Sequence, residues 1–166
     1  YYDADIDVNT LLQYRSWIGA DRDGNPNVTS EVTWETALKQ RKTVLELYKE
    51  DLTSLLRYLS ISDKQVTIPV DLGLSLEKDS EHYPLSEKYM RHYKHEPYRR
   101  KIAHMILKLD EQLAALKDPL EVLLQKASKY TVSDFLSDLK LIKDSLIDSG
   151  LSKLSKSGPL PELIIR

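Results

Sequence analysis

The chain has 166 residues, 41% of them hydrophobic and 30% charged, which is the balance of a globular domain long enough to bury a core. Its 24 Lys and Arg against 26 Asp and Glu give a net charge of −2, which argues against nucleic acid or a membrane surface as a partner, and no apolar run is long enough to cross a bilayer. The lack of cysteine excludes disulfides, thiolate catalysis and Cys-ligated zinc, and it is compatible with the cytoplasm.

Residues 1–29 are predicted to form a loop region that ends in an unusual motif. The opening residues, Ile6 to Ile18, alternate weakly and predict one short strand for which no partner strand is evident. The run from Ser16 to Ser30, SWIGADRDGNPNVTS, then places two glycines, two aspartates, an arginine and an Asn-Pro pair in one short stretch. A turn needs glycine and asparagine, but it does not need an arginine held between aspartates.

The residue types around Arg22 suit an anion-binding loop. Gly24 lets the backbone reach positive φ or approach a ligand closely, and Asn25-Pro26 forces a turn. That turn feeds the N-terminus of the following helix, where free N–H groups favour an anion. Arg22 offers planar, bidentate donors that suit phosphate or carboxylate, and Trp17 is expected to anchor the base of the loop.

Two other interpretations of the motif stay open. On composition alone, a helix-entry turn in which Arg22 merely pairs with Asp21 or Asp23 is favoured over a ligand site. A calcium loop fits poorly. Counted from Asp21, the glycine comes at position 4 and Glu31 at position 11, whereas an EF-hand loop needs them at 6 and 12.

Helical periodicity dominates the rest of the chain. A long helix is expected over residues 30–61, where apolar residues recur at helical spacing and Asn27 or Thr29 can cap the start. Residues 62–95 are expected to be an irregular connection that ends in a mobile surface loop. Within it, a brief extended piece is predicted at 66–70 and one short helix at 71–79.

Residues 96–166 are expected to be a helical region. Gly150 is the C-cap candidate of its last long helix, and the run SKLSKS at 152–157 is expected to be flexible. The fold class predicted is mainly all-α, with at most one or two short strands. The helices expected here cover residues 98–116, 118–124 (opened by Asp-Pro) and 131–148.

Several other polar residues are interpreted as ordinary solvated groups, and no metal ligand set is predicted. This interpretation covers the histidines His92, His95 and His104, the basic run Arg99 to Lys101, and the aspartates Asp134 and Asp138.

The motif from Ser16 to Thr29 closely resembles the SWxGGDRDGNPxVT signature of phosphoenolpyruvate carboxylases, with Ala20 where that family has glycine. The run Glu96-Pro97-Tyr98-Arg99, at the start of a predicted helix, is similar to the EPYR element of the same family. Residues 150–166 resemble the helical approach to the next strand of that family's barrel. The first motif is long and specific, and the second is short and supportive.

The resemblance implies an enzyme that carboxylates phosphoenolpyruvate with bicarbonate, giving oxaloacetate and phosphate, with Mg²⁺ or Mn²⁺. Such enzymes are large, cytoplasmic homotetramers, mostly helical and built around a β-barrel. The resemblance assigns contact with the substrate phosphate to Arg22. The residues implied to hold that side chain in place are Trp17, Asp21, Asp23, Gly24 and Asn25.

The chain is therefore expected to be a single, mostly helical segment of a much larger polypeptide, because it opens at Tyr1 rather than Met and stops as an apolar segment begins. The resemblance places the family's essential histidine upstream and its metal-binding carboxylates beyond Arg166. The segment alone is predicted to bind no metal and to be inactive. The alternative is a stand-alone, non-catalytic helical module that binds another protein with its Leu-rich faces.

Overall fold

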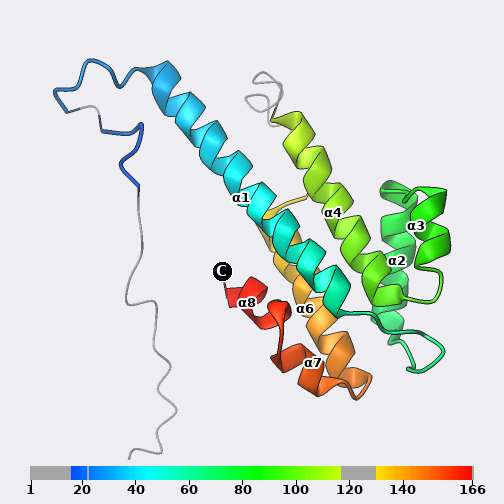
Figure 1. The fold of residues 1–166 in the computed structure, drawn as a ribbon. Coiled ribbons are helices and arrows are strands. Elements are labelled where there is room, and N and C mark those ends of the chain that lie inside the picture. The colour runs from blue at the N-terminus through cyan, green and yellow to red at the C-terminus, as the bar shows by residue number, and fades with distance from the viewer. Residues whose placement is uncertain (1–15, 22, 117–129, 166) are drawn as a thin grey trace, which may run out of the picture. The chain divides into compact units, whose positions relative to one another are not determined.

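The computed structural model describes residues 16–21, 23–116 and 130–165. These residues form helices and no strand, which confirms the mainly all-α fold class (Figure 1). The predicted helix at 118–124 and most of the predicted strand at 6–18 lie outside them. The helices described are α1 (Ser30–Tyr58), α2 (Val70–His82), α3 (Glu87–His92), α4 (Pro97–Ala115), α6 (Val132–Asp148), α7 (Ser152–Lys156) and α8 (Pro159–Ile165).

The chain divides into two compact units, residues 1–40 and 41–166, and the boundary falls within α1. In the first unit, Thr29 caps α1 as expected, because its hydroxyl oxygen accepts a hydrogen bond of 3.3 Å from the Val32 amide. A hydrogen bond with the Thr29 side chain also holds the pKa of Glu31, in the first turn, below its usual value.

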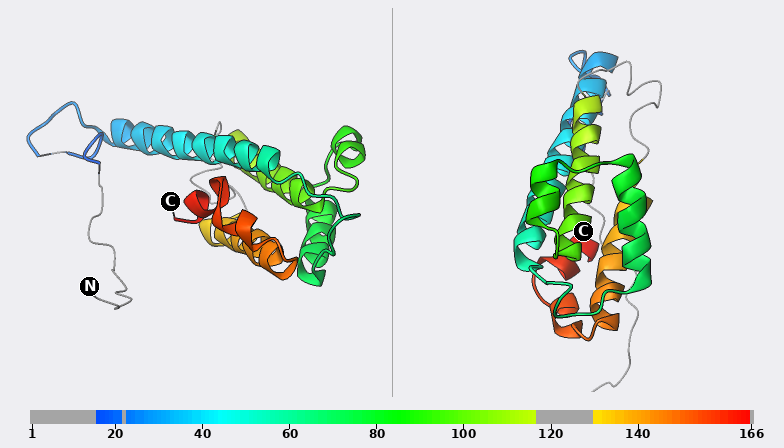
Figure 2. Two further views of the ribbon diagram at one scale, coloured as in Figure 1. Left: turned by 60° about the horizontal axis from the view of Figure 1, so that its bottom comes forward. Right: turned by 90° about the vertical axis from the view of Figure 1, so that its right-hand side faces the viewer.

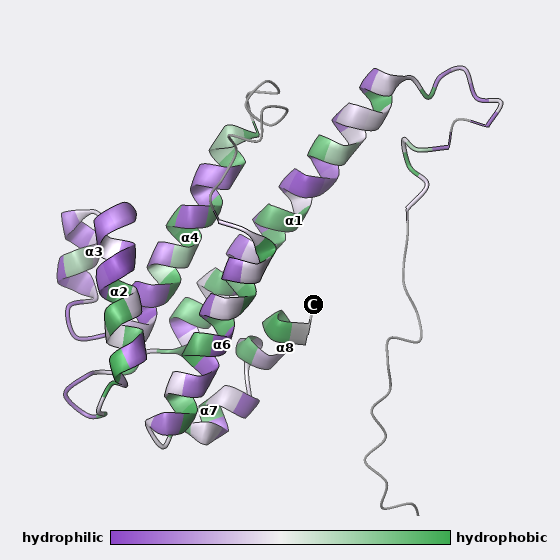
Figure 3. Cartoon of the chain, turned by 180° about the vertical axis from the view of Figure 1, so that it is seen from behind, coloured by the Kyte–Doolittle hydropathy of each residue, from purple (hydrophilic) through white to green (hydrophobic). Residues whose placement is uncertain are grey.

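The second unit is built on α4 and α6. Helix α4 packs against α2 and α6, and α6 also contacts α7 and α8 (Figure 2). Apolar and polar positions alternate along these helices with helical periodicity (Figure 3), so each buries one stripe. The fully buried side chains of this core are Leu52, Leu55, Leu59, Leu72, Tyr98, Ile102, Met105, Leu139, Ile142, Leu146 and Leu160.

Both ends of α6 carry the signals that the sequence contains. At the start, Thr131 and Asp134 form a capping box, in which the Thr131 hydroxyl accepts from the Asp134 amide at 3.2 Å and the Asp134 carboxylate accepts from the Thr131 amide at 2.8 Å. At the end, Gly150 has φ +76°. Its amide donates to the Ile147 carbonyl and the Leu151 amide donates to the Leu146 carbonyl. This pair of hydrogen bonds is a Schellman motif.

Residues 62–95 are more helical than expected. Helix α2 extends past both ends of the helix predicted at 71–79, and α3 occupies part of the expected surface loop. The run 152–157, expected to be flexible, contains α7 instead. Residues 66–69 form no strand. No helix within the described ranges is long and apolar enough to span a membrane.

Candidate functional site

The motif loop, residues 16–29, begins with a tight turn at Gly19. The amides of Ala20 and Asp21 both donate to the Trp17 carbonyl, at 3.0 and 3.4 Å. Gly19, which lies between Trp17 and Ala20 in the chain, has φ +70°. A side chain rarely adopts that φ, so this position needs glycine. The side chains of Trp17 and Ile18 are each 74% exposed, so within this chain the indole packs little against the loop.

The second half of the motif loop is shaped by its own polar side chains. The Asp21 carboxylate accepts from the Asp23 amide at 3.4 Å, across the position of Arg22. The Asn25 side-chain oxygen accepts from the Asn27 amide at 3.1 Å, and its backbone carbonyl accepts from the Val28 amide at 3.2 Å. These bonds form an Asx turn that leads the chain into α1.

Gly24 completes the loop with φ +70° and open space around its Cα, so its backbone conformation alone requires glycine there. Arg22, the residue predicted to bind the substrate, lies outside the described residues. Asp21 and Asp23 flank it in the sequence and Asn25 follows, and the side chains of Asp21 and Asn25 accept from the amides of Asp23 and Asn27.

The second motif, Glu96 to Arg99, is a structural clamp. The Arg99 guanidinium donates to the Leu56 carbonyl at 2.8 Å and to the Arg57 carbonyl at 3.4 Å, which are among the last carbonyls of α1. Its other edge pairs with the Glu96 carboxylate at 3.1 Å, and that carboxylate also accepts from the Ser60 hydroxyl at 2.7 Å. Arg99 thus caps the end of α1 and ties it to the start of α4.

The remaining residues of this motif begin α4 and fix it to α6. Pro97 is at the first helical position, where its missing N–H costs nothing. Tyr98 is fully buried, and its hydroxyl lies 3.0 Å from the Ser145 hydroxyl and 3.2 Å from that of Ser149. Ser149 in turn donates to the Thr67 carbonyl at 3.0 Å.

The two motifs are accompanied by a match to one family along nearly the whole chain. The family model of phosphoenolpyruvate carboxylase matches residues 1–165. A phosphoenolpyruvate carboxylase of Rhodothermus marinus is 41% identical over 165 residues, covering 99% of this chain and 17% of that relative. One of a Nostoc species is 42% identical over 149 residues, covering 86% of this chain and 14% of the relative. The chain belongs to the phosphoenolpyruvate carboxylase family.

The extent of the match also bears on the size of the protein. The chain spans 14–17% of the length of these phosphoenolpyruvate carboxylases, which fits a segment of the enzyme rather than a stand-alone binding module. A further relative, the phosphoenolpyruvate carboxylase of a Synechococcus strain, is 35% identical over 170 residues, covering 92% of this chain and again 17% of the relative.

Within this phosphoenolpyruvate carboxylase segment, one polar cluster was missed by sequence reasoning. We name it the buried ion-pair cluster: Asp79 of α2, Lys101 and Lys108 of α4, and Asp138 of α6. The Lys101 ammonium lies 2.7 Å from Asp79 and 2.6 Å from Asp138, and the Lys108 ammonium lies 2.6 Å and 3.1 Å from the same two carboxylates. Ser75 also accepts from Lys101 at 2.7 Å. The interpretation of Lys101 and Asp138 as solvated groups is therefore wrong.

The electrostatics of the buried ion-pair cluster are balanced. Burial opposes ionisation of Asp79, but the two lysines outweigh it and hold the pKa of Asp79 below its usual value. Burial likewise opposes the charge of Lys108, yet the two carboxylates raise the pKa of that lysine. Burial and the neighbouring Asp138 raise the pKa of Tyr130, whose hydroxyl donates to Asp138 at 2.8 Å. The cluster joins three helices. Because it contains two positive and two negative groups, it has no net charge with which to attract a substrate.

His104 borders this cluster and is fully buried, so its interpretation as a solvated loop histidine is also wrong. Its Nδ1 donates to the Tyr83 carbonyl at 2.9 Å, and within the described part of the chain Nε2 has no hydrogen-bond partner. Burial lowers the pKa of His104, which keeps the ring neutral. A sequence signal existed: Lys101 and Lys108 are seven residues apart, on the same side of α4 as Tyr98 and Met105.

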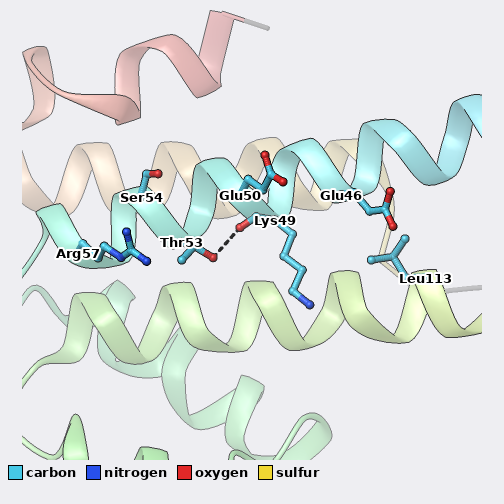
Figure 4. A pocket seen from close by; sticks show the side chains of 7 residues that line it. All are labelled: Glu46, Lys49, Glu50, Thr53, Ser54, Arg57 and Leu113. Atoms are coloured by element: carbon cyan, nitrogen blue, oxygen red, sulfur yellow. Dashed lines mark hydrogen bonds between the residues drawn. The ribbon is translucent and has the colours of Figure 1, made fainter.

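A cleft on the second half of α1 is a weaker candidate (Figure 4). Its polar lining is of mixed charge, and Lys49 already pairs with Asp110 at 2.5 Å. Anion binding needs a surplus of positive charge, which this cleft lacks. The residues that line it are Glu46, Lys49, Glu50, Thr53, Ser54 and Arg57 of α1, with Leu113 of α4.

Proposed function

We propose that the chain is part of an enzyme that carboxylates phosphoenolpyruvate with bicarbonate to give oxaloacetate and inorganic phosphate. The family match over residues 1–165 is the observation that carries the proposal. The motif loop is its contribution to the active site, with Arg22 binding the phosphate of the substrate. We expect the whole enzyme to be a cytoplasmic homotetramer.

The chemistry needs fixed positive charge in this place. Phosphoenolpyruvate is an anion of high charge, and its carboxylation passes through carboxyphosphate and an enolate, both also anionic. A guanidinium that is already in position stabilises such charge without reorganisation. Asp21 and Asn25 support the proposal, because each bonds a backbone amide of the motif loop and so shapes the segment that carries Arg22. Asp23, Gly24 and the backbone carbonyl of Trp17, which accepts from the Ala20 and Asp21 amides, are proposed to support the same segment.

The family also implies a divalent metal ion, Mg²⁺ or Mn²⁺, which supplies positive charge to the developing enolate. Within the described residues, no group of three His, Asp or Glu side chains could hold such an ion. As the family resemblance implies, we propose that other parts of the enzyme hold the metal and that the role of this chain is confined to the phosphate.

The role of Arg22 is tested by Arg22→Ala in the full-length enzyme. We expect kcat/KM for phosphoenolpyruvate to fall by roughly 10²–10³-fold, the usual cost of removing one group that stabilises transition-state charge. Arg41→Ala, which removes an exposed arginine of α1, is the matched control and should stay within a few-fold of the parent. Unchanged kinetics in Arg22→Ala would show that Arg22 is not a substrate ligand.

A further inference from the structure

A groove of about 670 Å³ lies in the second unit, between α1, α3 and the middle of α4. Because a cavity of roughly 150 Å³ already holds a benzene ring, this groove has room for several large side chains. We name it the apolar groove, after the side chains that form most of its lining: Leu56, Leu85, Tyr89, Tyr93, Ile106 and Leu107.

Two helices form the walls of the apolar groove. On α1, the lining residues Lys49, Thr53 and Leu56 recur at helical spacing and cover about two turns. On α4, Ile106 and Leu107 line the groove and are half-buried. The side of α4 that faces the core carries Tyr98, Ile102, Met105 and Leu109. A helix with apolar residues on two sides has two surfaces to bury, and the described chain covers the second one only in part.

Helix α3 contributes two tyrosines to the apolar groove. The rings of Tyr89 and Tyr93 stack at 5.9 Å with 25° between their planes. Tyr93 is buried, whereas Tyr89 is 49% exposed. A half-exposed aromatic ring beside other apolar side chains is typical of a surface on which another protein segment packs.

The apolar groove has no net charge. Its two charged lining residues, Lys49 of α1 and Asp110 of α4, pair with each other at 2.5 Å. Figure 4 shows Lys49 extending from α1 toward α4. A charged occupant would lose water and find no unpaired group of the opposite sign among these lining residues, so the groove suits an uncharged, apolar occupant.

We propose that the apolar face of a helix from another part of the carboxylase polypeptide packs into the apolar groove. The chain spans 14–17% of the length of the Rhodothermus and Nostoc enzymes, so more than four fifths of such a polypeptide lies outside the matched segment. A third helix laid between α1 and α4 meets side chains at helical spacing on both, which is how ridges of one helix pack into the grooves of others. The inference rests on the proposed function in taking the chain as part of a larger enzyme, and it does not need Arg22 to bind the substrate.

Cysteine labelling tests whether the apolar groove is covered in the full-length enzyme. Ser86→Cys and Tyr89→Cys place a thiol at exposed positions of the groove lining, and Glu87→Cys places one between them, outside the lining. The Glu87 side chain is 94% exposed in the chain, which makes it the matched control. With a maleimide reagent, and peptide mass spectrometry to locate the label, we expect the two groove thiols to react about tenfold or more slowly than the control. Equal rates at all three positions would overturn the proposal.

The same labelling decides between two occupants. A second subunit of the enzyme also carries apolar helices, but it leaves when the enzyme dissociates. The labelling is therefore repeated at a dilution at which sedimentation shows single protomers. Protection that persists there supports a helix of the same polypeptide, whereas protection that is lost assigns the groove to a subunit interface and contradicts the proposal.

The ion pair in the apolar groove gives a second measurement. Lys49 and Asp110 are 39% and 43% exposed in the chain, and such a pair contributes little to stability until a helix covers it. Once covered, either Lys49→Met or Asp110→Leu leaves a buried, unpaired charge, so each should shorten the half-life of thermal inactivation about tenfold or more, while the double variant recovers most of the loss. Lys42→Met and Glu46→Leu remove an exposed pair of α1 and should have small, additive effects. Small, additive effects at Lys49 and Asp110 as well would show that no helix covers the pair.

The labelling also separates this inference from the proposed function. An enzyme that carboxylates phosphoenolpyruvate but labels Ser86→Cys and Tyr89→Cys as fast as Glu87→Cys would keep the proposed function and refute the groove helix. An enzyme without that activity whose two groove thiols stay protected would do the reverse.

Discussion

At the scale of single residues, His104 shows how burial decides the charge of a side chain. Its Nδ1 is occupied by the Tyr83 carbonyl, so a second proton would have to go on Nε2, which is buried without an acceptor among the described residues. Its neighbours Lys101 and Lys108 also oppose a positive charge, while Asp79 favours one. Burial is the largest of these effects, and the pKa of His104 is lowered.

This lowered pKa predicts a pH dependence of stability. Since the folded pKa of His104 lies below the value of 6.5 for a free histidine, the unfolded chain binds more protons as the pH falls through that range. The free energy of unfolding should therefore decrease from pH 7 to pH 5. This pH interval lies above the one in which Asp79 takes up its proton. His104→Asn keeps a donor for the Tyr83 carbonyl but cannot titrate, so urea unfolding at pH 7, 6 and 5 should show a flatter profile. The exposed His82→Asn serves as the control variant, and equal slopes in parent and His104→Asn would contradict the prediction.

The same residues show what the sequence could not reveal. The motif loop was recognisable because its glycines, Asx turn and arginine are contiguous. Asp79, Lys101 and Asp138 come from three helices, and their attraction depends on packing that no local pattern encodes. With acidic and basic residues nearly equal in number, each of them looked like an ordinary solvated charge.

At the scale of elements, the long helices were predictable and the short ones were not. Helices α4 and α6 repeat apolar residues over several turns and carry proline, capping-box and glycine signals at their ends. Helices α3 and α7 have 6 and 5 residues, too few to establish a periodicity, and their exposed faces are charged. Helix α7 packs against α6 and α8, and no local pattern in the sequence encodes that packing.

The Arg99 clamp gives a prediction at this scale. Lysine keeps the charge of Arg99 but cannot donate to two carbonyls and a carboxylate at once, so Arg99→Lys should lower the free energy of unfolding by about 1–2 kcal/mol. Amide hydrogen exchange in the last turn of α1 should accelerate more than exchange in α6, because the Leu56 and Arg57 carbonyls lose their partner. Arg91→Lys is the control, since that side chain is 81% exposed. Exchange that accelerates equally in both helices would show that Arg99 is not a local clamp.

At the scale of the whole molecule, the loop proposed to bind substrate and the helical scaffold fall in different compact units. The motif loop belongs to the first unit, while the ion-pair cluster and the Arg99 clamp belong to the second. The second unit connects its helices through buried charge and apolar packing and leaves no described metal site. If the proposed function holds, the chain contributes a loop that binds the substrate phosphate and a helical scaffold beside it in the sequence, and the remaining chemistry comes from the rest of the enzyme.

This division predicts that the chain of 166 residues does not catalyse the carboxylation of phosphoenolpyruvate by itself. A single arginine on a loop supplies none of the metal or proton-transfer chemistry, and removing such groups from an enzyme costs many orders of magnitude in rate. The assay contains phosphoenolpyruvate, bicarbonate and Mg²⁺ and detects oxaloacetate with a coupled dehydrogenase. The chain should give no more oxaloacetate than buffer does. A full-length relative serves as the positive control. Turnover by the chain that is lost in Arg22→Ala, and kept in Arg41→Ala, would instead mean that a complete active site lies within these residues.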